Sequence, residues 1–403
     1  MPVWDDVVGQ PHVVAELSAA AADADAQVTA QAAGEPAKTA SSMTHAWLFT
    51  GPPGSGRSTA ARAFAAALQC VSPDRALGAP PGCGFCDGCH TTVIGTHADV
   101  EFVRTDLLSI GVKETRDLVR RATLSPSGGR WQVIVIEDAD RLTEGAANVL
   151  LKGIEEPAPR TVWLLCAPSV EDALPTIRSR CRLLSLRTPS ADAVAEVLSR
   201  RDGIDPRLAA EVARATQGHI GRARRLATDE SARSRRATVL RLPLRVADIG
   251  GCLRAAQELV DSATEDAKAV AEGMDAKETE ELRTAMGAAA GAGGRMPRGT
   301  AGVMKDLADR QKRRSTRTQR DTLDLALTDL AGFYRDVLAV QLGVGGSIAN
   351  VEAQQGIEQI ASSSRAEHTL RRIEAVLACR DALDRNVAPL LAVEAMTLAL
   401  RAG

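Results

Sequence analysis

A glycine-rich segment near residue 50 has the residue types of a loop that binds phosphate. It follows a short apolar run and reads GPPGSGRST from Gly51 to Thr59. This matches the pattern G-x-x-x-x-G-K-[ST] except that Arg57 stands in place of the lysine. Glycines let such a loop turn its backbone N–H groups around phosphate oxygens, and the N-terminus of the next helix adds partial positive charge. The candidate pocket residues are Gly51, Gly54, Gly56, Arg57, Ser58 and Thr59. A chance glycine-rich turn is the alternative.

Three departures from the pattern of an active ATPase concern this pocket. Arg57 puts a bulky, planar guanidinium where lysine would bring a compact ammonium to the phosphates. An apolar run near residue 135 ends in Glu137 and Asp138, whereas an ATPase needs Asp first, to hold Mg²⁺, and then the longer Glu, to orient water. A later apolar run leads into Ala167 and Pro168, where a polar side chain would contact the terminal phosphate. We therefore expect weak or absent ATP or ADP binding and little turnover; solvated acids at a strand end are the alternative interpretation of the two carboxylates.

Four of the eight cysteines are close together in the sequence. They are Cys70, Cys83, Cys86 and Cys89. Four thiolates at this spacing can surround one zinc ion as a tetrahedron, and a site closed in this way is structural rather than catalytic. The intervening loop is rich in glycine and proline, so the metal would supply most of its folding free energy. Free or redox-active thiols are the alternative.

A single arginine, Arg180, lies in the tripeptide Ser179-Arg180-Cys181 after a short helical run. The plain interpretation is a surface arginine near a sheet edge. The functional interpretation is an arginine finger, a guanidinium offered to the γ-phosphate that a neighbouring subunit binds. Such a residue acts in trans, so it is useful even where its own subunit hydrolyses nothing.

A basic run extends from Arg310 to Arg320 at the start of a long predicted helix. A solvated helix end is the simpler interpretation of such a run. Contact with DNA phosphates or with an acidic patch on a partner is the alternative. Because the run contains no aromatic residue, we do not expect it to stack on single-stranded bases.

The composition limits the class of protein. The chain has 403 residues, 45% of them hydrophobic and 25% charged, with a net charge of −2. A core of substantial size is therefore expected, and a globally basic nucleic-acid-binding surface is excluded. No apolar run reaches the roughly 18–20 residues of a membrane span. The N-terminal residues lack the features of a secretory signal, so we expect a soluble, cytoplasmic protein with no membrane partner.

Short apolar runs alternate with helical stretches up to about Leu186, which indicates α/β units around a parallel sheet. The predicted strands are Ala46–Thr50, Val100–Val103, Val133–Ile136, Val162–Cys166 and Arg182–Leu186. From Ser190 onward the pattern is helical. We predict an α/β core over residues 1–188 with the cysteine module 70–89 inserted, a small helical domain over 189–230, and a helical domain over 231–403 with a flexible insertion at about 262–302.

These motifs together resemble the bacterial DNA polymerase III clamp-loader family of the AAA+ superfamily. The matching segments are Trp4–Gln10, Gly51–Thr59, the four cysteines, Ile136–Leu142, Ala147–Lys152, Glu155–Pro157, Ser179–Cys181, Gly218–Ala223, Asp329–Leu338 and Asn386–Leu398. The resemblance implies an α/β AAA+ P-loop core, a small helical lid and an all-α collar that joins the subunit to a hetero-oligomer. Such a complex contains motor and delta subunits, and it places a sliding clamp on primed DNA during DNA replication.

Within that family, the resemblance implies a division between motor subunits and a stator. Motor subunits keep the Walker lysine and the Asp-Glu pair, and the stator has lost them and donates its Ser-Arg-Cys arginine. Arg57, Glu137 and Asp138 match the stator, with Arg180 as the donated arginine. An active ATPase motor subunit is the alternative. A zinc-stabilised DNA-binding module is a third hypothesis, which the near-neutral net charge disfavours.

Overall fold

Every strand predicted from the sequence is present, and the strands form one parallel sheet. The computed structural model describes all residues except 36–40, 106, 108, 129, 286–300 and 345–347. The described strands are β1 (Ala46–Thr50), β2 (Val100–Val103), β3 (Gln132–Ile136), β4 (Thr161–Ala167) and β5 (Arg182–Ser185), in the spatial order β2-β3-β4-β1-β5. The predicted bounds agree to within one residue at each end. The predicted α/β fold class is confirmed.

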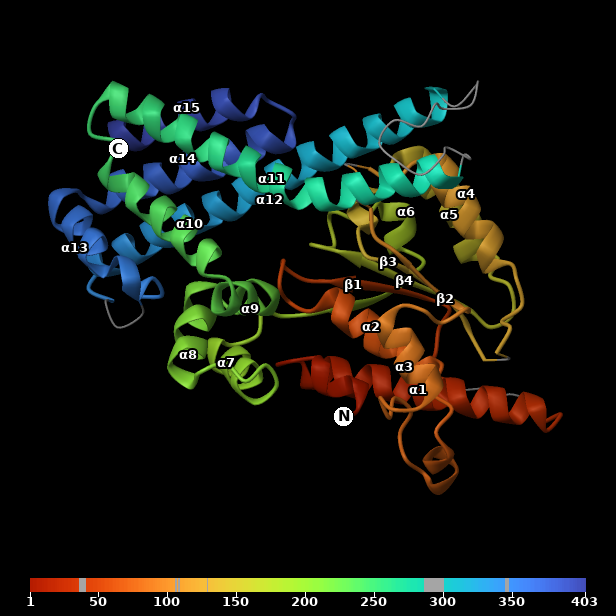
Figure 1. The fold of residues 1–403 in the computed structure, drawn as a ribbon. Coiled ribbons are helices and arrows are strands. Elements are labelled where there is room, and N and C mark those ends of the chain that lie inside the picture. Colours follow the sequence, from red (N-terminus) through yellow and green to blue (C-terminus); the bar gives the residue numbers. More distant parts are fainter. Residues whose placement is uncertain (36–40, 106, 108, 129, 286–300, 345–347) are drawn as a thin grey trace. The chain divides into compact units, whose positions relative to one another are not determined.

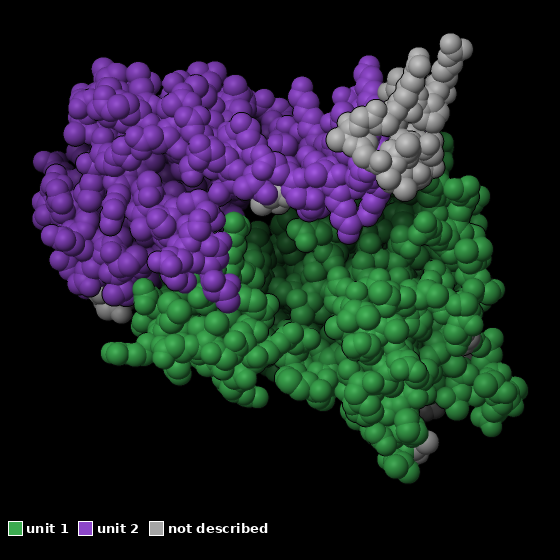
Figure 2. All heavy atoms as spheres, viewed as in Figure 1, with its two compact units in different colours: residues 1–227 green, residues 228–403 purple. Residues whose placement is uncertain are grey.

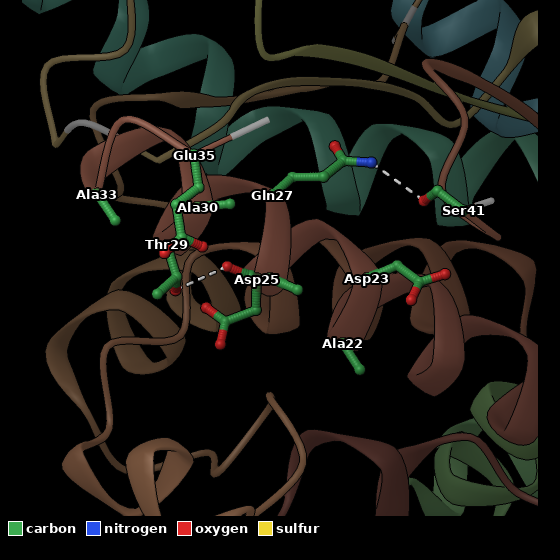
Figure 3. Close-up of a pocket in the computed structure, with 10 residues that line it drawn as sticks. Ala22, Asp23, Asp25, Gln27, Thr29, Ala30, Ala33, Glu35 and Ser41 are labelled. Atoms are coloured by element: carbon green, nitrogen blue, oxygen red, sulfur yellow. Dashed lines mark hydrogen bonds between the residues drawn. The ribbon is translucent and has the colours of Figure 1, made fainter. Parts of the chain in front are cut away.

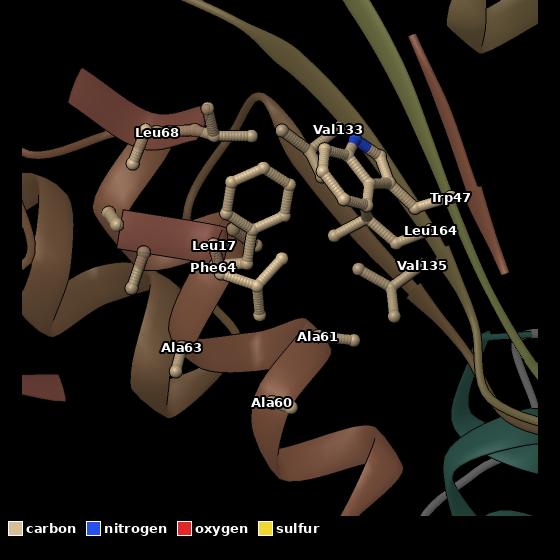
Figure 4. Packing of buried hydrophobic residues seen from close by; sticks show 14 of the residues in the cluster. Leu17, Trp47, Ala60, Ala61, Ala63, Phe64, Leu68, Val133, Val135 and Leu164 are labelled. Atoms are coloured by element: carbon tan, nitrogen blue, oxygen red, sulfur yellow. The ribbon is translucent and has the colours of Figure 1, made fainter. Parts of the chain in front are cut away.

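Helices cover both faces of this sheet (Figure 1). Alternate residues of a strand point to opposite faces, so Trp47 and Val133 face α1 and α2, while Leu48 and Ile134 face α4 and α5. The covering helices are α1 (Pro11–Ala32), α2 (Arg57–Leu68), α4 (Val112–Ala122) and α5 (Glu144–Glu155). Trp47 packs edge-on against Phe64 of α2, with ring centroids 5.2 Å apart (Figure 4). Because both faces are buried, β1, β3 and β4 are apolar throughout most of their length.

Shorter elements complete the first part of the chain. They are the helices α3 (Asp87–Ile94), α6 (Pro175–Arg178), α7 (Ala191–Arg200), α8 (Pro206–Ala215) and α9 (Ile220–Thr228), and the 3₁₀ turns η1 (Val3–Asp6), η2 (Pro73–Leu77) and η3 (Ala139–Arg141). Ser190 caps α7, because its hydroxyl accepts a hydrogen bond from the backbone N–H of Ala193 at 3.2 Å.

The chain divides into two units, Met1–Ala227 and Thr228–Gly403 (Figure 2). The predicted core (1–188) and the small helical domain (189–230) fall almost entirely in the first unit. Their separation from each other stays a prediction. The second unit corresponds to the predicted domain over 231–403.

The second unit is helical in its described residues. It contains α10 (Glu230–Arg241), α11 (Ile249–Ala285), α12 (Ala301–Gln341), α13 (Gln354–Ser363), α14 (Ala366–Asp384), α15 (Pro389–Ala402) and the 3₁₀ turns η4 (Leu242–Leu244) and η6 (Val351–Ala353). One apolar stripe on α12, which includes Leu323, Leu327 and Tyr334, is buried in its core. None of the described helices of the chain is both long enough and apolar enough to cross a membrane.

The predicted insertion at about 262–302 differs in part from the structure. Residues 262–285 continue helix α11, and Ala263, Ala267 and Ala271 are buried along it. Small side chains at this i, i+4 spacing let a second helix approach closely, and α12 is the helix with which α11 has the most extensive contact. Most of the Ala/Gly-rich segment that suggested flexibility, residues 286–300, lies outside the described residues.

Part of the basic run on α12 is not solvated. Arg314 and Arg317 are each only 8% exposed. The guanidinium of Arg314 donates to both oxygens of Glu278 on α11, at 2.7 and 2.8 Å, and also to Asp275. The hydrogen bond with Glu278 raises the pKa of Arg314. Arg314 therefore joins α11 to α12, Arg317 pairs with Asp321 of α12 itself, and the solvated-end interpretation fits only the other charges of the run.

A buried polar network holds α10 against α12. Arg236 is 7% exposed, and its Nε donates to Asp329 Oδ1 at 3.0 Å. The same guanidinium contacts Asn350 and Glu352. Asp336, which is fully buried, accepts hydrogen bonds from the backbone N–H and the side-chain amide of Asn350, both at 2.8 Å. Arg236 and Asp336 thus each have several partners.

We expect Arg236→Ala to lower the free energy of unfolding of the chain by about 3 kcal/mol, because it leaves the Asp329 carboxylate buried without its cation. Urea unfolding, monitored by circular dichroism, measures this change in the free energy of unfolding. Arg241→Ala is the matched control, since Arg241 is an exposed arginine at the end of the same helix. An equal, small effect of both substitutions would show that the network does not stabilise the unit.

Candidate nucleotide pocket, cysteine cluster and surface arginine

The glycine-rich segment forms a loop between β1 and α2, as predicted. Gly54 and Gly56 have φ angles of +87° and +92°, which residues with a side chain rarely adopt. Gly56 precedes the first turn of α2, so the backbone N–H groups of that turn open onto the loop. The strand, the loop and the helix therefore have the arrangement that binds phosphate in other proteins.

Arg57 occupies the position of the missing lysine and is partly buried. Its Nη1 atom is buried and has no hydrogen-bond partner among the described residues. Burial lowers the pKa of Arg57, and the nearby carboxylates of Asp140 and Asp138 oppose that effect. A buried donor without a partner is costly, and a phosphate oxygen would satisfy it. The loop and Arg57 thus fit a bound anion, although the fork of the guanidinium differs from a lysine ammonium.

The two carboxylates after β3 are engaged with the protein. Glu137 Oε1 accepts from Arg62 Nη2 of α2 at 3.3 Å. Asp138 Oδ2 accepts from the backbone N–H of Thr105 at 3.1 Å. Glu137, at the position where an ATPase holds Mg²⁺ with Asp, is therefore already paired with a cation. This arrangement does not favour a metal ion at that point.

Two residues that the sequence analysis did not single out contact the loop. Gln10 is 1% exposed, and its side-chain amide donates to the backbone O of Ser55 at 3.2 Å and accepts from the backbone N–H of Arg187 at 3.2 Å. His219 lies directly against Gly54: a Cβ on Gly54 would be 2.5 to 2.8 Å from three of its atoms. Burial, followed by the charge of Arg222, lowers the pKa of His219. A neutral imidazole therefore covers part of the loop.

The four predicted cysteines come together in one cluster. The sulfur atoms of Cys70, Cys83, Cys86 and Cys89 all lie within 4.8 Å of one another. Cys83 and Cys89 are 4.0 Å apart and Cys70 and Cys86 are 3.9 Å apart. Four sulfurs at 2.3 Å from one zinc ion would be about 3.8 Å apart, so the cluster fits a tetrahedral metal site.

Hydrogen bonding between Cys70 and Cys89 favours the thiolate form of Cys70. The contact with Cys89 lowers the pKa of Cys70, and the same contact raises the pKa of Cys89. Thiolates are the form that binds metal.

The N-terminus of the chain supports the cysteine loop. The backbone N–H of Val3 donates to Gly82 O at 2.9 Å, and Trp4 Nε1 donates to Pro81 O at 3.0 Å. Gly88 on α3 allows a close approach to the backbone of Gln69, which a side chain at that position would prevent. The loop therefore contacts the 3₁₀ turn η1 and the end of α2.

Arg180 is exposed at the edge of the sheet opposite the glycine-rich loop. It comes two residues before β5, and Arg182 of β5 pairs with Trp47 near the beginning of β1. The loop follows the other end of β1, at Thr50. Parallel strands of this length extend over about 13 Å. The Arg180 side chain therefore cannot reach the phosphate site of its own chain, which lies at the opposite end of the strands.

Comparisons with known proteins identify the family. A family model described as DNA polymerase III, delta subunit, matches residues 35–190, and one described as DNA polymerase III, delta subunit, C terminal, matches residues 318–400, so that the two cover more than half of the chain. The chain is 37% identical over 176 residues to the DNA polymerase III subunit delta' of Pseudomonas aeruginosa, which is 43% of this chain and 52% of that protein. The chain belongs to the delta-prime family of DNA polymerase III subunits.

Other similarities are more partial. The delta-prime-type chain is 34% identical over 192 residues to the DNA polymerase III subunit gamma/tau of Mycobacterium tuberculosis, over 46% of this chain and 30% of that protein. It thus spans about half or less of the length of these curated relatives. A solved structure of a DNA polymerase III gamma subunit-related protein from Thermotoga maritima aligns with 89% of this chain and 95% of its own, with a TM-score of 0.34 and 15% identity.

A separate cavity of about 450 Å³ lies beside the second half of α1 in this delta-prime-type chain (Figure 3). Two of the acidic groups that line it, Asp23 and Asp25, already have partners. Asp25 pairs with Arg75 and with Arg130, the latter at 2.7 Å, and Asp23 accepts from the backbone N–H and the hydroxyl of Ser42, both at 2.6 Å. We assign no ligand to it.

Proposed function

We propose that the chain is a non-hydrolysing stator subunit of a DNA polymerase III clamp loader that donates Arg180 to the nucleotide bound by a neighbouring ATPase subunit. The observation that carries this proposal is the place of Arg180, exposed at the sheet edge opposite its own loop. A phosphate that contacts this guanidinium would have to be bound by another chain. In this role the subunit helps to load the sliding clamp on primed DNA, in a hetero-oligomer with motor and delta subunits.

The subunit's own pocket is proposed to bind ATP or ADP weakly or not at all, and to hydrolyse neither. Three features of the pocket support this. Arg57 replaces the lysine, Arg62 forms an ion pair with the Glu137 carboxylate, and His219 covers Gly54. Together they leave the loop's fold intact without the metal-binding carboxylate or the compact cation that phosphoryl transfer needs.

The cysteine cluster is proposed to hold one structural zinc ion. The four sulfurs supply all four ligands, so no position remains for a water or a substrate. The zinc would join the end of α2, the 70–89 module and α3, and it takes no part in the nucleotide chemistry.

The alternative, an active motor subunit, predicts a different result for the purified chain. We expect steady-state ATP hydrolysis far below about 1 s⁻¹, a rate at the low end for working enzymes. We also expect Arg57→Lys to leave hydrolysis undetectable, because Glu137 remains paired with Arg62. A phosphate-release assay measures both, with an intact-lysine motor subunit of the same loader as the positive control. Turnover near 1 s⁻¹ by the unmodified chain would exclude the stator.

A further inference from the structure

The guanidinium of Arg180 is held along one side by its own chain. Its Nε donates to Glu155 Oε1 at 2.5 Å. Its Nη1 donates to the backbone O of Thr176 at 2.9 Å and to the hydroxyl of Ser179 at 3.1 Å. The side chains of Arg180 and Glu155 remain 39% and 46% exposed. The guanidinium is therefore oriented while it stays open to solvent.

These contacts leave one end of the guanidinium available. A guanidinium has five N–H donors, two of them on Nη2. In the part of the chain that the structure describes, Nη2 of Arg180 makes no hydrogen bond, whereas Nε and Nη1 do. Phosphate oxygens are recognised by just such N–H groups. The end that a phosphate on another subunit would meet is thus the end that its own chain does not use.

Glu155 is itself well fixed. It is the last residue of α5, and the preceding Ile154 is fully buried in the core on the sheet face that α4 and α5 cover. On the other side, α6 carries Thr176 and is anchored by Ile177, which is 2% exposed. Two anchored helices therefore hold an arginine side chain that would otherwise lose rotamer freedom when it becomes ordered.

We infer that Glu155 is a positioning residue for Arg180, whose carboxylate fixes Nε so that Nη2 faces a triphosphate on the neighbouring subunit. The inference rests on the proposed function, since it concerns the same arginine. A carboxylate also neutralises part of the charge that attracts phosphate, and this effect on the rate has the opposite sign. Exchange of the carboxylate for an amide separates the two effects, since glutamine keeps the acceptor oxygen and removes the charge.

The test uses the complete reconstituted loader with clamp and primed DNA. We expect Glu155→Ala to lower the single-turnover rate of ATP hydrolysis at the site that receives Arg180 about tenfold, since small misplacements of a reacting group have effects of this size or larger, with the ATP concentration for half-maximal rate nearly unchanged. Glu155→Gln should stay within about twofold of the unmodified loader, because the amide oxygen still accepts from Nε. Glu156→Ala is the matched control, an exposed carboxylate one residue away.

The other outcomes are distinct. If Arg180→Ala abolishes stimulated hydrolysis and Glu155→Ala does not change it, the positioning role is wrong and the donated arginine stands. If Glu155→Ala and Glu155→Gln both accelerate hydrolysis, the carboxylate restrains the arginine by its charge, which also overturns the inference. If Arg180→Ala itself changes nothing, the proposed function fails, and the role of Glu155 fails with it. Thermal unfolding of each variant confirms that the fold is kept.

Discussion

Arg180→Ala is expected to leave the loader assembled and to slow ATP hydrolysis by on the order of 10³-fold at the one site that receives this arginine. The physical reason is the charge that builds on the γ-phosphate as the bond to it breaks, which a guanidinium stabilises by about 4 kcal/mol at this ratio. Assembly should survive because, among the described residues, the hydrogen bonds of Arg180 are with Glu155, Thr176 and Ser179, all at the surface.

The measurement is single-turnover hydrolysis in the reconstituted complex, since steady-state rates include the other motor sites. Arg178→Ala is the matched control, an exposed arginine at the end of α6. Arg180→Lys should restore only part of the rate, because an ammonium keeps the charge and loses the planar fork. Equal rates for the Arg178 and Arg180 variants would remove the proposed role.

The elements that position this arginine were predictable from the sequence. Strands β1, β3 and β4 are apolar over most of their length, for example at Val133–Ile136 of β3. The glycine-rich loop and the cysteine cluster were predictable because each is a local motif whose spacing alone fixes its geometry. Burial of the α12 stripe followed from its helical period.

The tertiary contacts of the same site were not predictable. Nothing near His219 indicates that it lies on Gly54, and nothing near Glu155 indicates that it binds Arg180. Such pairs are set by how distant segments fold together, and neither period nor motif encodes them. The solvated-end interpretation of the basic run was wrong at Arg314 for a related reason. The sequence around Arg314 does not show that α11 brings Asp275 and Glu278 beside it.

Loss of the metal ligands is expected to have the largest effect on stability. We expect one zinc ion per chain in the unmodified protein and less than that in Cys86→Ser, because a serine hydroxyl does not replace a thiolate ligand. Structural zinc sites contribute on the order of 10 kcal/mol of binding free energy near neutral pH. The substitution should therefore unfold the cysteine module and lower the melting temperature of the first unit.

Hydrogen exchange locates the change and elemental analysis counts the metal. The backbone N–H of Val3, which donates to Gly82 O, should lose protection together with the loop, while α12 should keep its protection. Cys252→Ala is the control, because this buried cysteine belongs to the core of the second unit. A Cys86→Ser protein with full zinc content and unchanged exchange would contradict the site.

The pH dependence of zinc binding has a defined sign. Burial raises the pKa of Cys83, and the contact with Cys70 raises that of Cys89, so both thiols must lose a proton before they ligate the metal. Zinc binding therefore releases protons, and the affinity falls as the pH is lowered. Titration with a zinc chelator at several pH values should show easier removal of the metal, and earlier unfolding of the module, at lower pH. A chelator midpoint that does not move with pH would mean that these thiols do not bind the metal.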